Sequence, residues 1–150
     1  MPYVTVASRR IEYERIEVAG GGRPTLVFLH EGVGSVAMWR DFPSRVAQAT
    51  GCNTVVTSRY GYGNSDSLAA PRTARYMHDE ALTALPELLD KLEIDRPILV
   101  GHSMGAPVAL LAAARLAPRV LGVIGVESLH DAELRYPPGF LEQTAAALEQ

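Results

Sequence analysis

The chain has 150 residues, is 47% hydrophobic and 21% charged, and carries a formal net charge of −3 at pH 7. These values are typical of a soluble globular domain, and without a basic stripe they do not favour nucleic acid or an anionic membrane as a partner. The sequence shows no signal peptide, no apolar run of the roughly 20 residues that a membrane helix needs, and one cysteine, Cys52, so we expect a cytoplasmic protein without internal disulfides.

The N-terminal third predicts strands. Two β-rich stretches, residues 3–7 and 11–18, lie on either side of a short polar break and predict an antiparallel pair. Their alternation slips near Arg15 and Ile16, where we allow for a β-bulge. Residues 25–29 form a continuous apolar run, which is typical of a strand covered on both faces.

Helices and strands then alternate. Residues 35–49 predict a helix with Ser35 as its N-cap and Gly51 beyond its end. Residues 73–92 predict a second helix, which Pro86 should kink. Further strands are predicted at residues 54–57, 97–100 and 120–126.

This order of elements predicts an α/β fold. We expect a mostly parallel sheet with an antiparallel first strand and helices on both faces. Residues 1–128 would form this core. Residues 129–150, with a predicted helix at 140–148, would begin a cap or a C-terminal helical segment.

The segment Gly101-His102-Ser103-Met104-Gly105 lies between a predicted buried strand and a predicted helix. A sharp strand-to-helix turn brings the residues two before and two after the serine together, which favours glycine at both places. Gly-x-Ser-x-Gly in this context is typical of a nucleophile elbow, and the Met104 N–H would lie near the serine oxygen. The alternative is a glycine-rich turn that only packs tightly.

Four segments in this order resemble the α/β-hydrolase superfamily, namely His30-Glu31-Gly32, residues 59–65, residues 101–105 and Val126-Glu127-Ser128. The resemblance covers residues 3–128 and implies the N-terminal portion of that fold, without its last strands. It also implies cofactor-free acyl chemistry on esters, thioesters, lactones or activated amides.

By this resemblance, the N–H groups of Gly32 and Met104 would form an oxyanion hole, and His30, Glu31, Val33 and His102 would contact the substrate. His30 would mainly brace its loop, and His102 would shape the pocket wall. Glu31 stands where the family commonly has glycine. It is either a solvated loop charge or an acid that contacts the substrate or handles a proton.

The resemblance implies a triad in the order serine, acid, histidine. Glu127 is a candidate acid, with a role in anchoring a cap or lining the pocket as the alternative. His130 is the one histidine after Ser103, and its position does not favour it as the base. The last strand would be an open edge, which permits self-association.

We therefore expect a serine hydrolase that acts on a small carboxylic ester or related acyl compound through an acyl-enzyme. The alternative is a non-catalytic or truncated module that binds a small ligand or assembles with another chain. No cofactor is expected, and the four histidines and one cysteine lack the paired spacing of metal ligands. An epoxide hydrolase or dehalogenase is disfavoured, because those branches of the family place aspartate where Ser103 stands.

Overall fold

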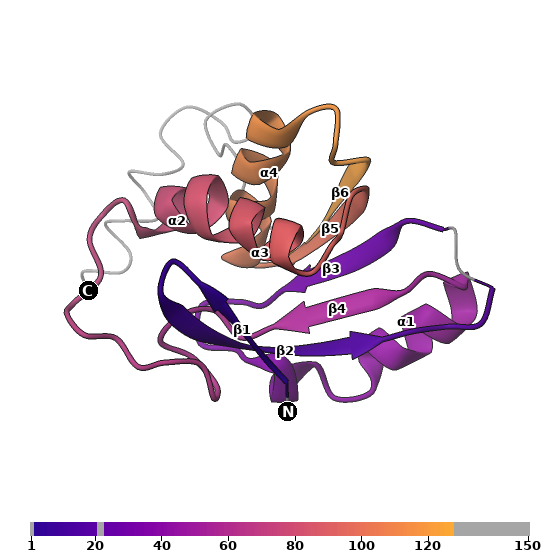
Figure 1. Ribbon diagram of the computed structural model, residues 1–150, viewed down its shortest axis with the longest axis horizontal. Coiled ribbons are helices and arrows are strands. Elements are labelled where there is room, and N and C mark those ends of the chain that lie inside the picture. Colours follow the sequence, from indigo (N-terminus) through magenta and orange to yellow (C-terminus); the bar gives the residue numbers. More distant parts are fainter. Residues whose placement is uncertain (1, 21–22, 128–150) are drawn as a thin grey trace, which may run out of the picture.

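The computed structural model describes residues 2–20 and 23–127 (Figure 1). Its six strands form one mixed sheet in the order β1-β2-β4-β3-β5-β6. The strands are β1 (Tyr3–Val6), β2 (Arg9–Ile16), β3 (Thr25–Leu29), β4 (Thr54–Thr57), β5 (Pro97–His102) and β6 (Gly122–Val126). Strands β4, β3, β5 and β6 run parallel, while β2 is antiparallel to both of its neighbours. The predicted fold class is confirmed.

Strand β2 changes partner halfway along its length. Residues 9–12 pair with β1, and residues 13–16 pair with β4 in unbroken register. The bulge expected at Arg15 and Ile16 is therefore absent. Two consecutive residues of this strand, Ile11 and Glu12, are both buried, one in the apolar core and the other in a polar network.

The helix predicted over residues 35–49 is two elements, a 3-10 turn η1 (Val36–Trp39) and the helix α1 (Phe42–Thr50). Arg40, with φ at 51°, separates them, because the left-handed backbone region cannot continue a right-handed helix. Ser35 occupies the N-cap position of η1, as predicted, but its side chain makes no capping hydrogen bond. Gly51 ends α1 in the left-handed conformation, as predicted.

The helix predicted over residues 73–92 is also subdivided. It consists of α2 (Tyr76–Asp79), a π-helical turn η2 (Glu80–Ala84) and α3 (Leu85–Lys91). Pro86 lies in the first turn of α3, where its missing N–H leaves no α-helical bond unmade. The proline is thus accommodated by a wider turn before it.

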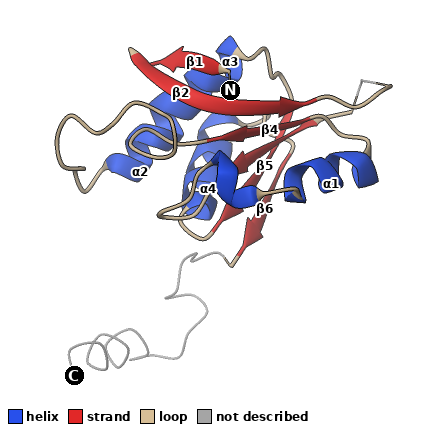
Figure 2. Ribbon diagram, turned by 90° about the horizontal axis from the view of Figure 1, so that it is seen from below, coloured by secondary structure: helices blue, strands red, loops and turns tan. Residues whose placement is uncertain are grey.

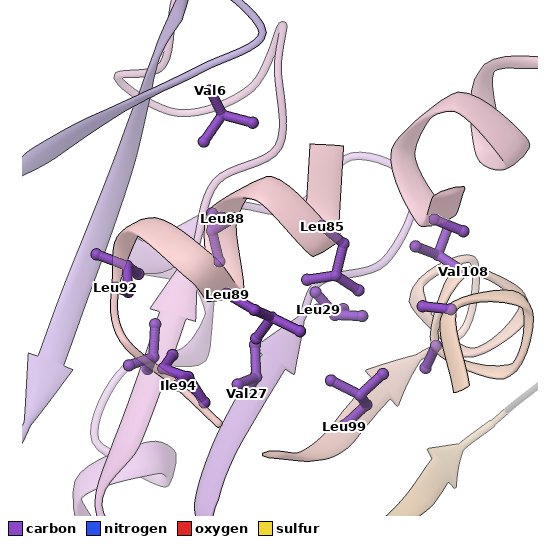
Figure 3. Packing of buried hydrophobic residues seen from close by; sticks show 14 of the residues in the cluster. Val6, Val27, Leu29, Leu85, Leu88, Leu89, Leu92, Ile94, Leu99 and Val108 are labelled. Atoms are coloured by element: carbon purple, nitrogen blue, oxygen red, sulfur yellow. The ribbon is translucent and has the colours of Figure 1, made fainter. Parts of the chain in front are cut away.

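Helices cover both faces of the sheet, as expected (Figures 1 and 2). On one face, α3 and α4 (Gly105–Leu116) pack on the sheet, and Figure 3 shows Leu85 and Leu89 beside Val27 and Leu99. On the other face, η1 and α1 cover a second cluster made by Leu26, Phe28, Val36, Cys52, Val56 and Val100. Neighbouring residues of β3 alternate between the two clusters, as a strand buried on both faces requires.

Strand β6 lies at one end of the sheet. Among the described residues it pairs with β5 alone, and its Ile124 and Val126 side chains are 49% and 40% exposed. Nothing in the described part tests the predicted division at residue 128, because residues 128–150 lie outside it. None of the described helices has both the length and the apolar character needed to cross a bilayer.

Candidate active site

Ser103 occupies a sharp turn between β5 and α4. Its φ is 49°, a left-handed conformation that a residue with a Cβ rarely adopts. A Cβ on Gly101 would lie 2.5 Å from Ala106 Cα, and one on Gly105 would lie 2.2 Å from the Leu29 carbonyl oxygen. Both contacts are with backbone, so neither glycine can be replaced without moving the chain.

Two hydrogen bonds fix the backbone of this turn. The Ser103 N–H donates to the Val126 carbonyl of β6 at 2.9 Å, and the Ser103 carbonyl accepts from the Ala106 N–H at 3.0 Å. The side chain of Ser103 is partly exposed at the start of α4, where the helix dipole favours negative charge. This is the geometry expected of the predicted elbow.

Gly32 lies next to Met104, as the predicted oxyanion hole requires. A Cβ on Gly32 would be 3.5 Å from Met104 Cγ. Within residues 2–20 and 23–127, the N–H groups of Gly32 and Met104 donate to no other group. Two backbone donors near one serine can stabilise an anionic tetrahedral intermediate when both point at its oxygen.

The Glu31 carboxylate is hydrogen bonded within its own loop. Its Oε2 accepts the Val33 N–H at 2.8 Å, so the carboxylate folds back on its own loop. A Cβ on Gly34 would lie 2.9 Å from His30 Cβ and 3.0 Å from Glu31 Oε1, so the loop leaves little room for a side chain there. The Val33 side chain points outward and is 82% exposed.

His30 is a buried brace. The Nδ1–H of its ring donates to the Glu31 carbonyl at 2.6 Å, and its Nε2 accepts the Arg59 N–H at 3.0 Å. Burial, assisted by the positive charges of Arg59 and Arg72, lowers the pKa of His30 to about 4, against the opposing effect of the Glu31 carbonyl. The ring is therefore neutral at physiological pH, and both nitrogens are occupied within the protein.

The guanidinium of Arg59 ties this loop to the helical layer. It donates to the Glu31 carbonyl at 2.8 Å and to Glu80 at 3.0 Å, and both charged side chains are largely buried. Arg72 binds the other oxygen of Glu80 at 3.0 Å. The sequence did not indicate a role for Glu80, since its position in a predicted amphipathic helix gave no sign of a buried carboxylate.

His102 and Glu127 lie beside the turn and contact each other. Their Nε2 and Oε2 atoms are 3.4 Å apart, and the Glu127 side chain is 82% exposed. The rings of His102 and Trp39 meet edge to face at 6.0 Å. A small recess of about 90 Å³ is lined by His30, Glu31, Met38, Trp39 and His102. Three of the residues expected to contact substrate thus share one recess, and Val33 does not line it.

The described part of the chain shows no general base in contact with Ser103. In the described ranges no histidine is hydrogen bonded to it, and the exposed His78 lies on α2. His130 lies outside the described residues. Nor do the described residues hold a cluster of three or more potential metal ligands.

A larger cavity of about 560 Å³ lies away from Ser103. It is bounded by the β1–β2 hairpin and by residues of α2, η2 and α3, among them Ile11, Leu85 and Leu88. Two of its charged lining residues, Arg59 and Glu80, are paired with each other. Size alone would favour this cavity as the site, but the smaller recess is the one lined by residues beside the serine.

The strand order and the turn at Ser103 define an α/β architecture of the hydrolase type. The chain belongs to the α/β hydrolase fold family, whose model matches residues 24–150. It is 29% identical over 119 residues to protein phosphatase methylesterase 1 of Mus musculus, covering 75% of this chain and 30% of that protein. It is 31% identical over 115 residues to a haloalkane dehalogenase of Mesorhizobium japonicum, covering 77% and 35%.

Solved structures give the same fold. One titled "Est816 as an N-Acyl homoserine lactone degrading enzyme" superposes with a TM-score of 0.73 at 24% identity, covering 99% of this chain and 52% of that one. The chain spans about a third of the length of the curated relatives and about half of this structure. The two curated relatives are named as a methylesterase and a dehalogenase.

Proposed function

We propose that this chain carries the nucleophile of a hydrolase that acts on a small carboxylic ester or related acyl compound. The observation that carries the proposal is Ser103 in a left-handed conformation between two glycines that cannot bear a Cβ. A backbone under such strain persists only where the surrounding structure enforces it, and such residues concentrate at active sites. The relatives named above support the reaction class.

In this proposal Ser103 Oγ attacks the acyl carbonyl carbon and its proton passes to a base. The Gly32 and Met104 N–H groups stabilise the oxyanion. Collapse of the intermediate expels the protonated leaving group and leaves an acyl-serine. Water then attacks the acyl-serine, releases the acid and returns the proton to Ser103. The base lies outside the described residues, and Glu127 is the proposed acid that orients it.

The test is labelling of Ser103 by a fluorophosphonate probe, with Ser103→Ala as the control. Added imidazole serves as an external base, so that labelling reports on the serine and its oxyanion site even if the chain lacks a base of its own. We expect imidazole-stimulated labelling of the wild type and none of Ser103→Ala. A folded wild-type chain that fails to react with imidazole present contradicts the proposal.

A second candidate is a non-catalytic module that binds a small ligand in the recess beside Ser103. The absence of a histidine bonded to Ser103 within the described ranges favours it. Under this alternative, compounds that raise the melting temperature would bind equally well to Ser103→Ala, and no p-nitrophenyl ester would be turned over.

We also propose that the exposed edge of β6 pairs with a second copy of the chain, which sedimentation at several concentrations would test.

A further inference from the structure

The loop between β3 and η1 is held at both ends by two consecutive residues that follow β4. Ser58 Oγ accepts the Val36 N–H at 2.8 Å, and the Arg59 N–H donates to His30 Nε2 at 3.0 Å. Ser58 and Arg59 are 0% and 7% exposed. Gly32 lies between these two attachment points, His30 and Val36, which therefore restrict where it can lie.

Glu12 of β2 sets the orientation of the Ser58 hydroxyl. Ser58 Oγ donates to Glu12 Oε2 at 2.7 Å, and the Ser58 N–H donates to the Glu12 carbonyl at 3.0 Å. A hydroxyl has one proton to donate. Because that proton is directed at the carboxylate, a lone pair of Ser58 Oγ remains for the Val36 N–H.

The Glu12 carboxylate is itself enclosed. Its side chain is buried, at 2% exposure, and it accepts from the Asn64 N–H at 3.0 Å and from Asn64 Nδ2 at 2.7 Å. A Cβ on Gly63 would lie 2.6 Å from Glu12 Oε2, so the loop after β4 closes directly over it. Burial of a carboxylate is unfavourable unless hydrogen bonds compensate it, and here they do.

We propose that Glu12 is a positioning residue for the Gly32 amide, acting through Ser58 and Val36. The carboxylate fixes the Ser58 hydroxyl, the hydroxyl fixes the Val36 end of the loop, and Arg59 fixes the His30 end. The importance of the Gly32 amide's placement for catalysis rests on the proposed function, in which Gly32 supplies an oxyanion donor. The effect of Glu12 on where the Gly32 amide lies does not depend on that function.

The first experiment measures the loop without reference to activity. Trp39, the single tryptophan of the chain, lies three residues after Val36 in η1 and reports on it by fluorescence. Glu12→Gln places an amide against the Ser58 hydroxyl and disturbs the direction of its proton. We expect a changed Trp39 emission and shifted amide resonances of Gly32 and Val36 in 15N NMR spectra.

Glu14→Gln is the matched control, because Glu14 lies on the same strand, opposite Val56, and makes no side-chain hydrogen bond to another described residue. It should leave the Trp39 emission and both amides unchanged. A folded Glu12→Gln protein with wild-type values for all three overturns the proposal. Should Glu12→Gln not fold, Ser58→Ala carries the test, and unchanged Gly32 and Val36 amides in that variant overturn it.

The second experiment measures the rate of imidazole-stimulated labelling of Ser103. Removing one oxyanion donor slows catalysis by about 100-fold or more, so a displaced donor should slow labelling by about tenfold in Glu12→Gln and not in Glu14→Gln. If the Trp39 emission and the amide resonances change in Glu12→Gln but the labelling rate does not, Glu12 does not act on labelling through Gly32. Failure of every variant, wild type included, to react refutes the proposed function instead, and the Trp39 and amide signals still decide the role of Glu12.

Discussion

The two segments that meet at Ser103 are held in place by different forces. The turn at residues 101–105 is fixed by steric exclusion, since two glycines lie where any Cβ would strike backbone. The loop at residues 30–36 is fixed by hydrogen bonds from Ser58 and Arg59, which come from another part of the chain. The steric constraint is insensitive to pH, whereas the hydrogen bonds of the loop depend on the protonation of their partners.

The largest expected effect is on the turn. Gly105→Ala places a Cβ 2.2 Å from the Leu29 carbonyl oxygen, so strand β3 or helix α4 must move. We expect the free energy of unfolding to fall by about 3 kcal/mol, measured by urea denaturation. Gly122→Ala is the control, because a Cβ there meets nothing within 4 Å. Equal losses in the two variants would show that close backbone contact does not fix the turn.

The loop should respond to pH through His30. Its folded pKa of about 4 lies below the ordinary value of 6.5, so the unfolded chain binds more protons between these values. Neutral His30 therefore adds about 3 kcal/mol to the free energy of unfolding above pH 6.5. This contribution is lost as the pH falls toward 4. The difference in unfolding free energy between wild type and His30→Gln should therefore shrink over this range. A constant difference contradicts the assignment of a neutral, buried ring.

The ion pair behind the loop should contribute somewhat less. Arg59 and Glu80 are 3.0 Å apart, with side chains 6% and 14% exposed. Glu80→Gln leaves a buried guanidinium without its counter-ion, and we expect a loss of about 2 kcal/mol in urea denaturation. Glu17→Gln removes an exposed pair at 4.0 Å and should change nothing measurable. If the two variants behave alike, the loop does not depend on the buried pair.

The smallest expected effect is a gain. Ser103→Gly removes the Cβ from a residue at φ 49° and should stabilise the protein by about 1 kcal/mol. Ser103→Ala retains the Cβ and should show no such gain, although both variants lose labelling by the fluorophosphonate. Thermal unfolding of the two variants side by side separates strain from loss of the hydroxyl. A gain of the same size in Ser103→Ala would argue against backbone strain.

The sequence predicts the sterically fixed part well. The mostly parallel sheet with its antiparallel start, the both-face burial of residues 25–29 and the glycines at 101 and 105 follow from local patterns, and the structure has them all. The sequence predicted a kink at Pro86 but not the division of both helices, because Arg40 at positive φ and the π-turn before Pro86 depend on packing rather than on propensity.

The hydrogen-bonded part was only partly predictable. His30 was expected to brace its loop, and the structure shows its two partners. Glu12 and Glu80 could not be singled out, because each is one of many carboxylates in the sequence until the fold buries it. The slip of alternation near Arg15 and Ile16 allowed for a bulge, and the unbroken pairing of residues 13–16 with β4 shows none.

The left-handed backbone at Ser103 also bears on how such a protein should be engineered. A library selected for heat resistance alone would enrich glycine at this position and discard the hydroxyl, because the selection rewards relief of strain. Any such screen therefore needs a simultaneous selection for reaction with the probe, or position 103 must be excluded from randomisation.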